Sequence, residues 1–140
     1  MSTGMDRFFH PLATITCSED KTFIVSDIGD VWYFGGCKRR IHPPVRLPGA
    51  HNIEQIVCGR FHIAMIDHHK VLWTAGRNQN GALGLGDCQS RNFPCPHHTL
   101  PPITFVSCGT NFTCCITEKG SLWAFGTNKS GQLGEPSVQE

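Results

Sequence analysis

This sequence has little net charge, no long apolar run and no helical periodicity. Its 140 residues include 12 Lys and Arg against 11 Asp and Glu, which leaves a formal net charge of +1. Tight binding of nucleic acid generally needs a basic face, so this balance argues against DNA or RNA as a partner. No apolar stretch approaches the ~20 residues that a membrane-spanning helix requires, so no membrane insertion is expected.

A secretory signal is also missing, because the residues up to Cys17 lack a basic and then apolar layout. We therefore expect an intracellular protein, cytoplasmic or nuclear. The eight cysteines would suggest disulfides in a small secreted protein, whereas reduced thiols are expected inside a cell. A zinc-dependent or disulfide-stapled secreted module is the disfavoured alternative.

No segment carries apolar residues at helical spacing over eleven or more positions. Glycine and proline are abundant instead, at 15 and nine residues, which indicates many turns. Short β-type runs lie between these turns and predict hairpins, so the expected fold class is all-β. The paired runs are 22–26 with 31–34, 63–67 with 71–75, and 113–117 with 121–125; strands 53–57 and 103–107 precede the last two pairs.

The chain contains an internal repeat. Each of three cysteines is followed fifteen residues later by a tryptophan and three residues after that by a glycine. The cysteines are Cys17, Cys58 and Cys108; the tryptophans are Trp32, Trp73 and Trp123; the glycines are Gly35, Gly76 and Gly126. We predict a degenerate first repeat with an N-terminal extension over 1–52, a second over 53–102, and a truncated third over 103–140.

The second and third copies continue into a shared G-x-N-x-x-G-x-L-G stretch that the first copy lacks. We expect its glycines to supply positive φ or close backbone approach. Phosphate binding is disfavoured because the stretch lacks the P-loop lysine and does not open a helix. The glycines are Gly76, Gly81, Gly84, Gly126, Gly131 and Gly134.

The hairpins are apolar at adjacent positions, as in the run Ala64, Met65, Ile66. Such strands are covered on both faces, and a repeated hairpin of this kind is typical of propeller blades. The run 58–62, Cys-Gly-Arg-Phe-His, the tryptophan strands, and the Asn-containing stretches resemble the repeat of the regulator of chromosome condensation family. The resemblance implies a seven-bladed propeller of which this chain supplies about three blades, the first degenerate.

Several residues invite a chemical role, and each has a structural alternative. Cys17, Cys58 and Cys108 are expected to be small buried scaffold residues. His62 is predicted to pack and hydrogen-bond within a blade, because no nucleophile or orienting acid stands at readable spacing; we therefore expect no enzyme activity and no cofactor. One cluster is a candidate metal site, but its spacing fits no zinc signature and a solvated loop is the expected structure. The cluster is Cys88, Cys95, His97 and His98.

Function is expected in residues that differ among the copies, since loops carry binding on a repeat scaffold. We predict a non-catalytic interaction module that binds a protein partner. The alternative, which only the family resemblance suggests, is guanine nucleotide exchange on a small GTPase of the Ran type with chromatin association. Further blades, from a longer chain or another subunit, are expected to complete the propeller. The candidate partner-binding residues are Lys38, Arg39, Arg40, Arg60, Arg77, Asn128 and Lys129.

Overall fold

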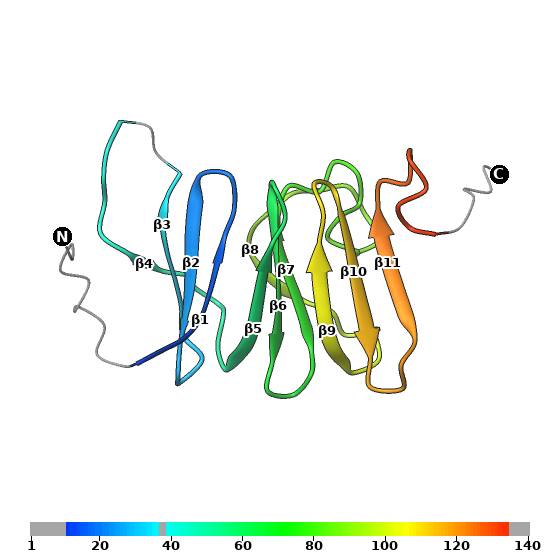
Figure 1. Cartoon of the computed structure of the whole chain (residues 1–140), viewed down its shortest axis with the longest axis horizontal. Coiled ribbons are helices and arrows are strands. Elements are labelled where there is room, and N and C mark those ends of the chain that lie inside the picture. The colour runs from blue at the N-terminus through cyan, green and yellow to red at the C-terminus, as the bar shows by residue number, and fades with distance from the viewer. Residues whose placement is uncertain (1–10, 37–38, 135–140) are drawn as a thin grey trace.

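The computed structural model describes residues 11–36 and 39–134, and every regular element in these ranges is a β-strand. Three antiparallel sheets follow one another along the chain (Figure 1). Blade 1 holds β1 (Leu12–Cys17), β2 (Lys21–Ser26), β3 (Val31–Gly35) and β4 (Val45–Arg46). Blade 2 holds β5 (Ile53–Cys58), β6 (His62–Asp67), β7 (Leu72–Gly76) and β8 (Arg91–Pro96). Blade 3 holds β9 (Ile103–Cys108), β10 (Phe112–Thr117) and β11 (Leu122–Gly126).

The sheets are simple meanders, since each strand pairs with the next one along the chain. They stand in a row in Figure 1, with blade 1 and blade 3 at opposite ends. Contacts between sheets fall on their first strands: β5 lies against β1 and β2, and β9 lies against β5 and β6. The all-β, partial-propeller prediction is confirmed.

Two apolar layers hold the blades together. Between blades 1 and 2, Phe23, Val25 and Val31 pack in one cluster with Ile53, Ile56 and Met65. Between blades 2 and 3, Ala64, Ile66 and Leu72 pack with Ile103, Val106 and Cys115. Strand β6 is buried along its whole length because adjacent side chains point to opposite faces and each face meets a different blade. Its consecutive apolar residues therefore have the predicted cover on both faces.

Strand β8 corrects one expectation. The segment around Cys95 is not the solvated loop that its composition predicts: Cys95 pairs with Thr74 in the blade 2 sheet, and His97 just beyond the strand is buried. Prolines at 94 and 96 conceal the strand in the sequence. Proline is tolerated here because β8 is an outer strand of its sheet.

The described residues contain no helix that is long and apolar enough to cross a membrane. All six glycines of the two Asn-containing stretches have positive φ.

Candidate binding face at the blade junctions

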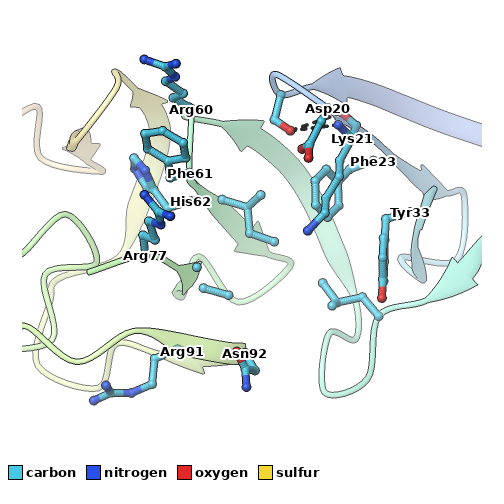
Figure 2. Close-up of a pocket in the computed structure, with 15 residues that line it drawn as sticks. Asp20, Lys21, Phe23, Tyr33, Arg60, Phe61, His62, Arg77, Arg91 and Asn92 are labelled. Carbon is cyan, nitrogen blue, oxygen red and sulfur yellow. Dashed lines mark hydrogen bonds between the residues drawn. The ribbon is translucent and has the colours of Figure 1, made fainter. Parts of the chain in front are cut away.

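A pocket of about 360 Å³ opens between blades 1 and 2. Its walls combine apolar side chains with several cations (Figure 2). The aromatic and apolar part includes Phe23, Tyr33 and Leu47 from blade 1. The polar part includes Lys21, Arg60, Arg77, Arg91 and Asn92, together with the acidic residue Asp20.

Phe61 organises two of these cations. It lies in the turn between β5 and β6, and its carbonyl accepts a 2.9 Å hydrogen bond from the backbone N–H of Arg77, the first residue after β7. The guanidinium carbons of Arg60 and Arg77 lie 4.9 Å and 4.6 Å from the centre of the Phe61 ring. Figure 2 places the ring between the two arginines. Stacking of this kind holds the planar guanidinium groups in place while leaving their edges able to donate hydrogen bonds.

The two arginines differ in their charge partners. Arg60 donates to both carboxylate oxygens of Glu19 in blade 1, at 2.9 Å and 3.3 Å. This hydrogen bond raises the pKa of Arg60, although an exposed ion pair of this kind adds little to stability. Arg77 is exposed, and within residues 11–36 and 39–134 no ion pair engages it. Arg77 is therefore placed to receive an external carboxylate, and so is Lys21, which also lines the pocket and has no ion pair within the same residues.

The other candidate partner-binding residues that the structure describes do not line this pocket. Arg39 and Arg40 are exposed in the segment between β3 and β4, and Lys129 is exposed after β11. The Asn128 side chain accepts a 2.9 Å hydrogen bond from the backbone of Leu133, so its oxygen serves the local turn. Lys38 lies outside the described residues. Binding roles for these residues stay predictions.

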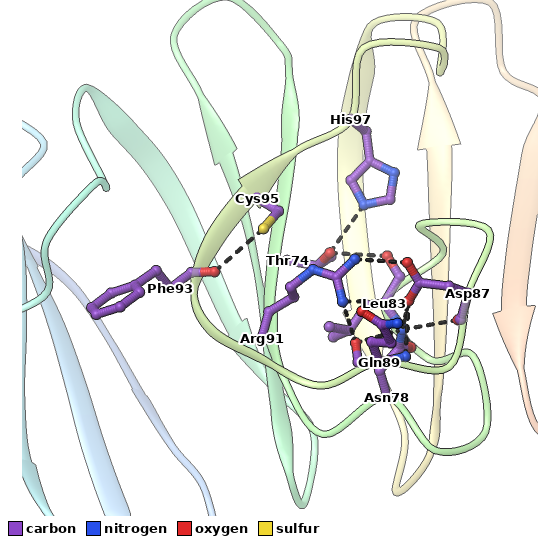
Figure 3. A network of polar contacts seen from close by, with 9 residues as sticks. All are labelled: Thr74, Asn78, Leu83, Asp87, Gln89, Arg91, Phe93, Cys95 and His97. Carbon is purple, nitrogen blue, oxygen red and sulfur yellow. Dashed lines mark hydrogen bonds and ion pairs between the residues drawn. The ribbon is translucent and has the colours of Figure 1, made fainter.

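Sequence reasoning missed Lys21, Phe61 and Arg91 as pocket residues. Lys21 stands at the repeat position that His62 occupies in blade 2, and its ammonium lies 5.9 Å from the centre of the Tyr33 ring. Arg91 is paired with Asp87 at 2.7 Å and donates to the carbonyl of Gln89 at 2.6 Å (Figure 3). The ion pair lowers the pKa of Asp87. The sequence does mark Lys21 as unusual, because it replaces the histidine of the repeat.

The three repeat cysteines are the last residues of β1, β5 and β9, and they line a shallow hollow shared by all three blades. Burial raises the pKa of the Cys58 thiol to about 11 and that of the Cys108 thiol to about 12. Such thiols stay protonated at neutral pH and are poor nucleophiles. Cys17 is exposed, so its predicted burial is wrong in this structure.

His62 joins blades 2 and 3 through hydrogen bonds. Its ring Nε2 lies 2.8 Å from the hydroxyl oxygen of Thr113, and that hydroxyl donates to the carbonyl of Ala82 at 2.8 Å. Because the hydroxyl proton is used on Ala82, Nε2 must carry a proton and donate to Thr113. The side chain is buried. This geometry agrees with a blade-packing histidine.

A second buried histidine repeats this arrangement. His97 Nε2 lies 3.0 Å from the hydroxyl oxygen of Thr74, which donates to the carbonyl of Leu83 at 2.9 Å (Figure 3). The His97 ring also stacks on Phe125 of blade 3, with ring centres 5.8 Å apart. Both histidines therefore contact blade 3, His62 through its hydrogen bond to Thr113 and His97 through ring stacking on Phe125.

The candidate metal cluster is not assembled. His97 is committed to Thr74, and the thiol of Cys95 points to the carbonyl of Phe93 at 3.5 Å. Cys88 and His98 are exposed. In the part of the chain that the structure describes, no three His, Cys, Asp or Glu side chains are grouped to hold a metal, and the seven cysteines there are free.

Folding stability is expected to fall when the pH is lowered below the ordinary histidine value of 6.5. Burial is the main cause that lowers the pKa of His62 and of His97, against opposing backbone hydrogen bonds. The unfolded chain then binds these protons more readily than the folded chain. Stability is fully present above 6.5 and is lost as the pH falls from there toward the folded-state pKa values.

Urea unfolding midpoints at a series of pH values measure this effect. His62→Gln keeps a side-chain N–H donor, and its unfolding midpoint should fall less than the native one as the pH is lowered below 6.5. His69→Gln, in an exposed turn, should lose as much stability in acid as the native chain. A fall in His62→Gln as large as that of the native chain would contradict the assignment.

Residues 71–116 match the family description "Regulator of chromosome condensation (RCC1) repeat", and residues 103–132 match a second repeat of that description. The ultraviolet-B receptor UVR8 of Arabidopsis thaliana is 30% identical over 139 residues, covering 89% of this chain and 32% of the receptor. A protein RCC2 homologue of Xenopus laevis is 44% identical over 75 residues, covering 52% of this chain and 15% of that protein. The chain thus spans about a third or less of these relatives.

Solved structures agree on the fold. Prp20p from Saccharomyces cerevisiae superposes with a TM-score of 0.79 at 17% identity, over 93% of this chain and 34% of that one. Human WBSCR16 superposes with a TM-score of 0.74 at 17% identity, over 87% of this chain and 34% of that one. By its repeats and its blade architecture, the chain belongs to the regulator of chromosome condensation repeat family.

Proposed function

We propose that the chain is a non-catalytic interaction module that binds an acidic segment of a protein partner at the pocket between blades 1 and 2. The observation that carries the proposal is the stacked group of Arg60, Phe61 and Arg77. Arginine and aromatic side chains are enriched among the residues that dominate binding energy at protein interfaces.

The pocket chemistry defines the segment that fits. The Arg77 guanidinium suits a carboxylate, because its planar fork donates two parallel hydrogen bonds to one acid group. On the blade 1 side of the pocket, across from Arg77, Phe23 and Tyr33 provide apolar wall, and Leu47 also lines the pocket (Figure 2). An acidic residue next to an apolar or aromatic residue matches both parts. The volume of about 360 Å³ lies in the range of small binding pockets and holds a few side chains, not a folded domain.

Reversing the charge of Arg77 is expected to weaken binding of an acidic peptide. The probe is a fluorescein-labelled glutamate-rich peptide containing one tryptophan, titrated with the full chain by fluorescence anisotropy. Arg77→Glu should raise the dissociation constant about tenfold or more, since a like charge replaces a paired one. A glutamine-rich peptide of the same length should bind more weakly than the acidic one.

Lys119→Glu is the matched control, because Lys119 is also exposed but does not line the pocket. An equal loss in both variants would reduce the effect to net charge and overturn the assigned site. Native-like affinity in Arg77→Glu would do the same.

Nucleotide exchange remains the alternative function. Prp20p, the yeast protein that shares this fold, has binding properties toward Gsp1p and histones. At 17% identity this likeness concerns the fold alone. Accelerated nucleotide release from a small GTPase, lost in Arg77→Glu, would replace the non-catalytic proposal by an exchange activity.

A further inference from the structure

The pocket between blades 1 and 2 opens where blade 1 lacks a stretch that blade 2 has. In blade 2 the Asn-containing stretch lies in the connection between β7 and β8, and copy one lacks it. Residues 39–44 of the shorter blade 1 connection run at the outer end of the row, away from blade 2 (Figure 1), and none of them lines the pocket. Both walls of the pocket belong to blades within the chain, so the pocket does not arise from an end of the row.

The junction between blades 2 and 3 shows what this stretch does where it is present. Ala82 and Leu83 are buried, at 2% and 0% exposed. Thr113 of blade 3 donates a hydrogen bond to the carbonyl of Ala82 at 2.8 Å, and Thr74 of blade 2 donates to the carbonyl of Leu83 at 2.9 Å. A small residue followed by an apolar residue is thus held by one hydroxyl from each blade.

The walls of the pocket are the repeat equivalents of these two threonines. A shift of 50 residues relates Thr113 to Ile63, and a shift of 41 relates Thr74 to Tyr33. Ile63 and Tyr33 both line the pocket. The hydroxyl of Tyr33 can donate to a backbone carbonyl as the hydroxyl of Thr74 does, whereas Ile63 offers apolar surface. The pocket therefore provides the place that a segment like 82–84 occupies one junction further on.

The third position of such a segment has different surroundings in the two junctions. A Cβ built at Gly84 would lie 2.7 Å from two carbons of the Phe125 ring. A shift of 50 residues relates Phe125 to Ala75, which lines the pocket and leaves room for a side chain there. Arg77, two residues further along, lines the same pocket, and no ion pair engages it in the described part of the chain. An acidic side chain at the third position would have both room and a charge partner.

We propose that the pocket recognises the sequence small–apolar–aspartate in a protein partner, with Ala-Leu-Asp as its simplest form. This rests on the proposed function, because it takes the same pocket and places the same kind of carboxylate on Arg77. The first two residues repeat the chemistry of Ala82 and Leu83. Aspartate is favoured over glutamate because the third position of the internal segment, Gly84, has a φ of +67°, and aspartate adopts left-handed backbone more readily than most residues with a side chain.

Two fluorescein-labelled peptides of identical composition test the order of the residues. One contains Gly-Ala-Leu-Asp-Gly and the other contains Gly-Asp-Leu-Ala-Gly, so length and charge are the same. Anisotropy titrations with the full 140-residue chain should give the Ala-Leu-Asp peptide a dissociation constant about tenfold lower. Equal affinities would overturn the proposal, because composition and charge alone would then account for binding.

Charge reversal at Arg77 tests the contact of the third residue. Arg77→Glu should bind a peptide with Gly-Ala-Leu-Lys-Gly about tenfold more tightly than the aspartate peptide, since the charges are exchanged across the contact. The native chain and Lys119→Glu, which changes an exposed residue outside the pocket, should keep the opposite order. An Arg77→Glu chain that still prefers aspartate would move the carboxylate to Lys21 and overturn the proposal.

Ala75→Phe tests the room at the third position. It restores the residue that blade 3 carries, so it should weaken binding of the aspartate peptide about tenfold while a Gly-Ala-Leu-Gly-Gly peptide still binds. An aspartate peptide that binds Ala75→Phe as tightly as the native chain would contradict the assigned position. Urea unfolding midpoints show whether the variants are folded. Ala75 is buried whereas Arg77 is exposed, so the charge reversal decides the result if Ala75→Phe does not fold.

The glutamate-rich peptide with one tryptophan separates this proposal from the broader one. If that peptide binds at Arg77 and the Ala-Leu-Asp order brings no gain, recognition of the residue order is wrong and binding of acidic segments stands. If neither that peptide nor the Ala-Leu-Asp peptide binds, both are wrong.

Discussion

Replacing Asn78 by alanine is expected to lower the free energy of unfolding by about 3 kcal/mol, because one buried backbone N–H and two backbone carbonyls in partly buried hydrogen bonds lose their partner together. The Asn78 amide nitrogen donates to the carbonyls of Asp87 and Gln89, at 2.9 Å and 3.1 Å (Figure 3). Its oxygen accepts from the backbone N–H of Leu83 at 2.9 Å. Asn78 is completely buried. Water therefore cannot replace these bonds without opening the loop.

The loop between β7 and β8 depends on this side chain because the loop contains no strand whose pairing could hold it in place. Leu83, also fully buried, is fixed at its N–H by Asn78 and at its carbonyl by Thr74. The chain is thereby returned to the sheet so that β8 can pair with β7.

Asn128→Ala is the matched control for this prediction. Asn128 stands at the same repeat position and accepts from Leu133 at 2.9 Å, but it is only half-buried. Water can satisfy the groups that its removal frees, so the loss should be clearly smaller than for Asn78→Ala. Urea denaturation followed by tryptophan fluorescence measures both. Equal losses in the two variants would show that burial of the loop is not the cause.

Gly84→Ala is the second change with a large expected effect. Gly84 has a φ of +67°, and a Cβ built there would lie 2.7 Å from two carbons of the Phe125 ring. Left-handed backbone costs about 1–2 kcal/mol for a residue with a side chain. The contact with Phe125 adds about 1–3 kcal/mol, because overfilling a packed junction displaces its side chains. The urea midpoint should fall accordingly, and the stacking of Phe125 on His97 should be disturbed.

Gly134→Ala separates these two costs. Gly134 occupies the corresponding repeat position with a φ of +85°, and among the described residues no atom beyond its chain neighbours lies within 4 Å of its added Cβ. This variant should lose only the backbone cost. If both alanine variants lose the same stability, the contact of blade 3 with the blade 2 loop is not tight, and the packing at Phe125 is wrongly placed.

The binding pocket was only partly accessible to sequence reasoning. Arg60 and Arg77 stand out in the sequence because they do not recur among the copies, and the structure brings them to one aromatic ring. Phe61 and Lys21 were missed because their importance comes from what stands opposite them. Phe61 contacts residues before β6 and after β7, which only strand pairing places side by side. Lys21 belongs to another blade.

The sequence by itself determined the repeat, the hairpins and the need for cover on both sheet faces. These features are local, or they recur at a constant spacing, so cysteine, tryptophan and glycine positions report them directly. Tertiary structure decided what each copy of a residue does. Gly84 and Gly134, Asn78 and Asn128, and Ile66 and Ile116 are equivalent in the repeat. Gly84 and Ile66 differ from their equivalents because blade 3 covers them, and Asn78 is fully buried whereas Asn128 is only half-buried. Packing against a neighbour is a non-local property, and a repeat pattern cannot say which of its copies has one.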